Sequence, residues 1–205
     1  QSMKQLPQEQ TGKTLFLGEM GLNGSLKPVL GVLPILREAA NQGFTRCVLP
    51  RENAREAAVV EGIHAYGLEN LRQVLDFLQG KEQPEPEVLD VQQLFESRKD
   101  HIEEDFADVQ GQESAKRAME IAAAGFHNLL LSGPPGAGKT MLARRFSTIL
   151  PPLTMEESLE VSSIYSVAGA LEPDHVILTK RPFLSPHHTI SELPWQGEEQ
   201  FQDRG

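Results

Sequence analysis

The sequence predicts an α/β fold in two parts, and two observations support this. Residues 14–80 alternate short apolar runs of strand length with longer runs of helical periodicity. The segment LSGPPGAGKTML, residues 131–142, is a glycine-rich loop between an apolar run and a helical pattern. Residues 81–107 are acidic and contain two prolines. We therefore predict domains over residues 1–80 and 108–205, joined by a linker over 81–107.

The elements of the first part follow from periodicity and turn residues. Strands are expected in TLFLGEM (14–20), SLKPVL (25–30) and FTRCVLP (44–50), and helices over 33–43, 53–62 and 68–80. Gly43 is a natural residue at the C-terminal end of the first helix. Asn53 is expected to cap the second helix, and Gly62 to end it.

The second part is organised around the glycine-rich loop. An alanine-rich helix leads through Gly125 to an expected strand NLLL (128–131), and a helix is expected over 139–150. The loop between them has the complete spacing G-x-x-x-x-G-K-T, in Gly133, Pro134, Pro135, Gly136, Ala137, Gly138, Lys139 and Thr140. Glycines let successive backbone N–H groups turn toward phosphates, and the helix N-terminus adds a favourable partial charge. Lys139 is expected to reach the β- and γ-phosphates, and the Thr140 hydroxyl to bind Mg²⁺.

Composition narrows the classes of function. The formal net charge of −10 and a pI of about 5.1 give no support for nucleic-acid binding through bulk charge. Cys47 is the single cysteine and lies in an apolar run, so we expect a core residue in a reducing compartment. The sequence contains neither a membrane-spanning apolar run nor a signal peptide, which predicts a cytoplasmic protein. The chain begins with Gln1, and we expect an upstream part.

Two specific segments carry a family resemblance. DVQGQESAKRAMEIAAAGFHNLLLSGPPGAGKTMLARR and RPFLSPHHTIS resemble the YifB/ComM family of magnesium-chelatase-like AAA+ ATPases, and the likeness covers residues 13–191. The resemblance implies ATP and Mg²⁺ as ligands, assembly into a ring (a hexamer), and remodelling of branched DNA during uptake of foreign DNA. It also implies that Asp108, Val109, Gln110 and Gly111 lie against the adenine. No guanine-reading Asn-Lys-x-Asp segment is present.

The first part resembles a protease domain that has lost its catalytic pair. LGEMGLNGSLKPVLGVLPILREAANQGFTRCVLPREN is similar to the protease domain of Lon and the Lon-like domain of RadA, which implies a ribosomal S5 domain 2-like fold. Pro34 stands where that family has its catalytic lysine, and the segment with the serine would lie upstream of Gln1. Lys27 is expected to be a surface lysine in a hairpin. We interpret this domain, incomplete at its N-terminus, as a non-proteolytic structural or docking module.

Two functional classes remain open. The first is an ATP-dependent motor subunit, and the second is a nucleotide-binding or interaction module without turnover. A third hypothesis is a chelatase-like insertion of Mg²⁺ into a porphyrin, but the Lon-like domain disfavours it. No apolar strand ending in an acidic pair follows Thr140, because HVILTK ends in Lys180. We therefore assign no catalytic residue in this chain and expect no ATP turnover from it.

Other polar residues invite weaker interpretations. His187 and His188 suggest a metal site, but adjacent side chains usually point apart and no third ligand clusters with them. We expect a loop instead. Arg144 and Arg145 follow the phosphate-binding loop and are expected to form a solvated helix face rather than a catalytic site.

The last residues, ELPWQGEEQFQDRG (192–205), depart from the resemblance. The family continues there with a glycine-rich stretch, and permissible codons for residues 193–205, read two bases later, encode such a stretch. We expect an out-of-frame remnant that packs poorly, with the remaining motor parts encoded downstream in another frame.

Overall fold

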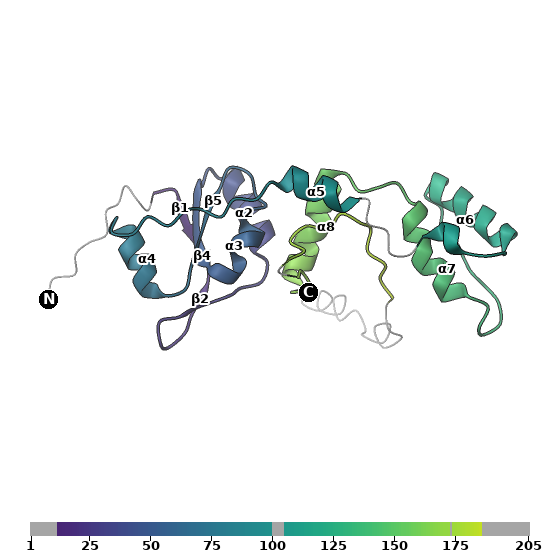
Figure 1. The fold of residues 1–205 in the computed structure, drawn as a ribbon, viewed down its shortest axis with the longest axis horizontal. Coiled ribbons are helices and arrows are strands. Elements are labelled where there is room, and N and C mark those ends of the chain that lie inside the picture. Colours follow the sequence, from purple (N-terminus) through teal and green to yellow (C-terminus); the bar gives the residue numbers. More distant parts are fainter. Residues whose placement is uncertain (1–11, 100–104, 173, 186–205) are drawn as a thin grey trace, which may run out of the picture. The chain divides into compact units, whose positions relative to one another are not determined.

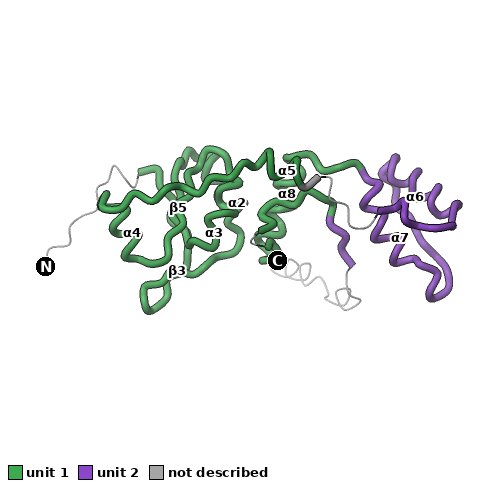
Figure 2. The backbone as a smooth tube through the Cα atoms, in the orientation of Figure 1, with its two compact units in different colours: residues 1–103, 151–181 green, residues 104–150, 182–205 purple. Residues whose placement is uncertain are grey.

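The computed structural model describes residues 12–99, 105–172 and 174–185 (Figure 1). These residues belong to two compact units (Figure 2). The first comprises residues 1–103 and 151–181, and the second comprises residues 104–150 and 182–205. His187, His188 and the predicted out-of-frame tail lie outside the described residues. The bounds of these units differ from those of the domains predicted over residues 1–80 and 108–205. The division into those domains stays a prediction.

The first unit is built on a three-stranded parallel sheet. Strands β1 (Thr14–Phe16), β4 (Arg46–Pro50) and β5 (His64–Leu68) are arranged in the order β1-β4-β5. The register pairs Leu15 with Cys47 and Cys47 with Ala65. Because side chains alternate along a strand, Cys47 and Leu49 face one apolar cluster while Val48 faces another. The predicted α/β class is confirmed, and the structure shows that the sheet is parallel.

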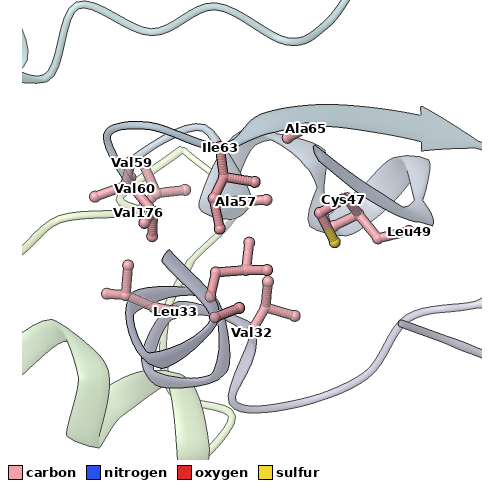
Figure 3. Close-up of a cluster of buried hydrophobic side chains, with 12 residues drawn as sticks. Val32, Leu33, Cys47, Leu49, Ala57, Val59, Val60, Ile63, Ala65 and Val176 are labelled. Carbon is pink, nitrogen blue, oxygen red and sulfur yellow. The ribbon is translucent and has the colours of Figure 1, made fainter. Parts of the chain in front are cut away.

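Helices cover both faces of this sheet (Figure 1). Helix α2 (Val32–Asn41) buries Val32, Leu33, Leu36 and Ala39, which recur on one face at the helical period. These residues join the cluster that contains Cys47 and Leu49 (Figure 3). On the other face, α4 (Leu71–Leu78) buries Val74 and Leu78 against Val48 and Leu68. The C-terminal end of α2 agrees with the prediction from sequence, because Gly43 follows the helix and has a φ of 85°.

A small antiparallel hairpin precedes α2. Strands β2 (Glu19–Met20) and β3 (Leu26–Lys27) pair Glu19 with Lys27. Lys27 is exposed, as expected for a surface lysine in a hairpin. The predicted strands 14–20 and 25–30 are shorter in the structure, because Gly18, with φ 143°, separates β1 from β2 and Pro28 follows β3.

Two expectations for the first part were wrong, and one strand was missed. The second helix ends at Ala57, so Gly62 does not end it. Helix α3 (Arg51–Ala57) begins directly after β4 with Pro50 at its N-cap, so Asn53 is not the cap. Asn53 is instead buried within the helix, and its side chain accepts a hydrogen bond from Val29 N and donates one to Val29 O, each 3.0 Å long. Strand β5 was missed, because it is only five residues long and contains Gly67.

Two further helices belong to the first unit. Helix α5 (Val91–Lys99) lies within the predicted linker and buries Phe95. Helix α8 (Met155–Val167) follows the phosphate-binding loop in sequence, yet it packs against α2. Thr154 and Glu157 form a capping box at its start. Hydrogen bonds from the Thr154 backbone and from Arg181 hold the pKa of Glu157 below its ordinary value.

The second unit contains the helices that flank the loop. Helix α6 (Glu113–Gly125) ends at Gly125, as expected, and α7 (Lys139–Phe146) follows the loop. Short 3-10 helices η1 (Phe106–Asp108) and η2 (Ser147–Ile149) complete it. Its core is a cluster of four buried residues: Phe106, Val109, Met119 and Leu142.

The expected strand at residues 128–131 does not form. A strand requires a hydrogen-bonded neighbour, and no strand in the described part of the second unit pairs with this segment. Leu130 is consequently 89% exposed, whereas Leu131 packs partly against the core of the unit.

Cys47 lies at the centre of the sheet and is fully buried. Desolvation raises the pKa of its thiol from 9.0 to about 12.

We predict that a thiol reagent at pH 8 modifies native Cys47 about a thousandfold more slowly than unfolded Cys47, because the thiolate is the reacting form. The rate is measured with and without urea, and comparable rates would contradict the prediction. The unfolded thiol ionises first as pH rises above 9, so this group also lowers the free energy of unfolding there.

Candidate nucleotide-binding site

The glycine-rich loop turns sharply before α7. Gly136 and Gly138 have φ values of 81° and 76°, in the left-handed region that favours glycine. A Cβ on Gly136 would meet no atom within 4 Å, so at that position the backbone conformation, rather than crowding, requires glycine. Helix α7 begins immediately afterwards at Lys139, so the loop leads directly into a helix N-terminus. The loop–helix connection inferred from sequence is confirmed.

The Lys139 side chain folds back onto the start of the loop. Its ammonium group donates hydrogen bonds to the carbonyl oxygens of Gly133, at 2.8 Å, and Pro134, at 2.7 Å. Ala137 N donates a hydrogen bond to Pro134 O at 3.3 Å, which closes the intervening turn. The positive charge is therefore held against the loop rather than extended into solvent.

The N-terminus of α7 is electropositive. Its first turn contains no acidic residue, and within the described residues no side chain caps it. Its backbone N–H groups and partial charge therefore favour an anion. Thr140 is exposed in this first turn. Arg144 and Arg145 lie in the last turn, at the opposite end of the helix, and Arg144 is exposed.

The core of the second unit anchors the loop. Leu142, in the first turn of α7, is buried in the same cluster as Val109. Val109 is 3% exposed, whereas Gln110 is exposed. Asp108 and Asp105 form a capping box around η1. Of the four residues expected near an adenine, Val109 is therefore part of the core. Asp108 already uses its carboxylate in the capping box of η1.

Gln112 is a residue of this site that sequence reasoning missed. Its side-chain amide donates a hydrogen bond to Ala137 O at 3.4 Å, and its backbone has φ 57°. A Cβ added at Gly138 would lie 3.4 Å from the same amide nitrogen. Gln112 precedes α6, so it links the start of that helix to the loop. Its closeness in sequence to the expected base-contacting residues was the available signal.

The other candidate residues do not assemble into a site. Pro34 lies in the first turn of α2, where a missing N–H is tolerated, and it offers no proton-transfer group. Among the residues that the structure describes, no three His, Cys, Asp or Glu residues cluster to hold a metal ion. No helix within the described ranges is long and apolar enough to cross a membrane.

Comparison with known families matches two models to this chain. Residues 105–205, which include the loop and both flanking helices, match a family described as "Magnesium chelatase, subunit ChlI". Residues 1–53 match a family described as "Subunit ChlI of Mg-chelatase". The two matches define the class of protein, a magnesium-chelatase-like chain with a ChlI-type N-terminal region and part of an AAA domain.

Individual relatives narrow this class. An uncharacterized protein of Mycobacterium tuberculosis is 44% identical over 185 residues, 90% of this chain and 36% of the relative. Uncharacterized protein YifB of Escherichia coli is 39% identical over 179 residues, 86% of this chain and 33% of the relative. Competence protein ComM of Haemophilus influenzae is 39% identical over 178 residues, 86% of this chain and 34% of the relative.

The chain belongs to the YifB/ComM family of magnesium-chelatase-like proteins. This confirms the resemblance carried by the loop segment and by RPFLSPHHTIS. The chain spans about a third of the length of these relatives. The match to the first family runs to residue 205 and so includes the segment 192–205; the hypothesis that this segment is out of frame stays a prediction.

We predict that Gln112 stiffens the loop for ligand binding. Gln112→Ala and Gln112→Gly both remove the amide, and we expect each to weaken Mg-ATP binding about twofold to fivefold, the effect of one modest hydrogen bond. Glycine accepts φ 57° without strain, so it separates the backbone effect from the amide effect. Calorimetric titration measures the affinity of each variant for Mg-ATP, and thermal unfolding measures its stability. Wild-type affinity in both variants would contradict the prediction.

Proposed function

We propose that this chain binds Mg-ATP at the loop formed by residues 133–140, as the nucleotide-binding part of a magnesium-chelatase-like AAA+ ATPase. The observation that carries the proposal is the loop itself. It combines two glycines of positive φ, a lysine held against the loop carbonyls and a helix N-terminus without an acidic residue. This combination suits a polyphosphate, because it presents backbone N–H groups and one positive charge together.

Each residue of the loop has a role in this proposal. The backbone N–H groups of Gly136, Ala137 and Gly138 surround the phosphates, since Pro134 and Pro135 have no N–H to donate. Lys139 exchanges its carbonyl contacts for phosphate oxygens. Thr140, exposed in the first turn of α7, supplies a hydroxyl ligand for Mg²⁺. Bound Mg²⁺ would neutralise phosphate charge.

The base of the nucleotide is assigned to the segment before α6. Gln110 is exposed and offers an amide, while Val109 fixes the backbone by its burial in the core of the unit. ATP is favoured over GTP, because the sequence contains no guanine-reading Asn-Lys-x-Asp segment.

For the N-terminal region we propose a Lon-like, ribosomal S5 domain 2-like fold without peptidase activity. The parallel sheet with helices on both faces and the β2–β3 hairpin before α2 support this proposal. The position aligned with the catalytic lysine is Pro34, which has no group that transfers a proton. A structural or docking role remains for this region.

The role of the whole protein is also a proposal, since the chain spans about a third of its relatives. Family membership supports a cytoplasmic ATPase that assembles into a ring, a hexamer, and acts on branched DNA. The name of one relative, competence protein ComM, supports a role in the processing of incoming DNA. The alternative is a nucleotide-binding or interaction module without turnover.

Calorimetric titration of the 205-residue chain with Mg-ATP tests the proposal. We expect weak binding that Lys139→Ala removes almost entirely, because the variant loses the only positive side chain that the loop holds in place. Arg144→Ala is the matched control, since Arg144 is an exposed cation in the last turn of the same helix. Equal affinity in the Lys139→Ala variant and the wild type would reject the site.

A further inference from the structure

Helix α8 is attached to the first unit through an unusual face. The residues it buries are three serines spaced four apart, Ser158, Ser162 and Ser166. Its apolar residues Ile164 and Val167 are 67% and 61% exposed. A surface helix normally buries its apolar stripe against the core, so the attachment of α8 depends on hydrogen bonds to an unusual degree.

The serines tie α8 to the segment that follows it. Ser162 Oγ accepts a hydrogen bond from Leu178 N at 2.8 Å, and Ser158 Oγ donates one to Leu178 O. At the ends of this segment, Arg181 donates to Pro151 O at 2.9 Å and pairs with Glu157. Residues 151–181 therefore form one closed piece, which we call the docking segment.

One carboxylate joins the docking segment to the N-terminal helices. Glu56 Oε1, from α3, accepts a hydrogen bond from Ser166 Oγ at 2.5 Å and another from Leu33 N at 3.1 Å. A single oxygen thus serves the first turn of α2 and the last turn of α8 together. Gly31 N donates to Ser166 O at 3.2 Å beside it.

Apolar burial in the docking segment comes mainly from residues outside the helix, since Leu153, Val176 and Ile177 are each at most 3% exposed. Val176 enters the main cluster of the sheet, where Figure 3 labels it with Val59 and Val60, and Leu159 packs partly against the same cluster. Leu30 lies over Gly169, where an added Cβ would approach it to 3.1 Å. The ion pair of Arg55 with Asp174 is exposed and adds little.

We propose that the N-terminal region is a docking surface for the ATPase segment of its own chain, and that Glu56 is the group that holds this segment in a reversible contact. The docking segment falls within the residues matched to the magnesium chelatase family, while α2 lies within the residues matched to the N-terminal ChlI family. The contact therefore joins a segment matched to one family with a helix matched to the other. Because helix α8 itself buries serines and is held largely by their hydrogen bonds, α8 opens while the sheet β1-β4-β5 stays folded.

Hydrogen exchange of the 205-residue chain tests this. In the wild type, amides of α8 should exchange faster than those of β4 and β5. Ser166→Ala removes only the hydroxyl and leaves the bond between Glu56 and Leu33, whereas Glu56→Ala removes both. We expect each to accelerate exchange in α8 roughly tenfold to a hundredfold, the effect of losing a partly buried hydrogen bond, with β4 and β5 unchanged.

Two matched control variants isolate the effect of the hydrogen bond between Glu56 and Ser166. Ser163→Ala alters a serine of the same helix whose hydroxyl donates a hydrogen bond to Leu159 O, and Glu52→Ala alters an exposed carboxylate of α3. Neither should change the exchange of α8.

Three results would overturn the proposal. The first is wild-type exchange in α8 of the Ser166→Ala variant, and the second is equal acceleration of α8 and the strands in both variants. The third is protection of α8 from hydrogen exchange that rises with protein concentration, because the α8 bound to each chain would then come from a second copy of the chain. None of these measurements involves nucleotide, so failure here and failure of the proposed function are distinguishable.

Discussion

The first unit depends on the position of strand β4 between two apolar clusters. Because its side chains alternate, Cys47 and Leu49 support α2 on one face of the sheet, and Val48 supports α4 on the other. The strand also continues without a loop into α3, which carries Asn53 and Glu56. A change that shifted β4 by one residue would exchange its faces and displace both polar side chains.

Asn53 and Glu56 show why buried polar groups on α3 matter. Asn53 satisfies both backbone groups of Val29, and Glu56 accepts from Leu33 N in the first turn of α2. Together they fix the approach to α2, where Gly31 adopts φ 75° as the N-cap. In the second unit, burial of Leu142 and Val109 in one core anchors the loop in a similar way, since both residues adjoin exposed functional segments.

Local signals explain what could be predicted for the site. The loop, the helix after it and the alanine-rich helix before it follow from glycine spacing and helical periodicity, which act over a few residues. Gln112 escaped prediction because its contact is made with Ala137, 25 residues later. The strand expected at residues 128–131 was wrong, because an apolar run becomes a strand only where another strand pairs with it.

The sequence by itself determined the α/β class, the glycine-rich loop before a helix, the core role of Cys47 and the family, because each rests on short-range patterns or on segments specific to that family. Tertiary structure decided that Asn53 joins the core instead of capping a helix, and that α8 buries its serines while Ile164 and Val167 stay exposed. The hydropathy of α8 does not indicate which face is buried. The buried serines find their partners only in the folded protein: Ser158 and Ser162 bond to Leu178, and Ser166 bonds to Glu56, which lies 110 residues away in the chain.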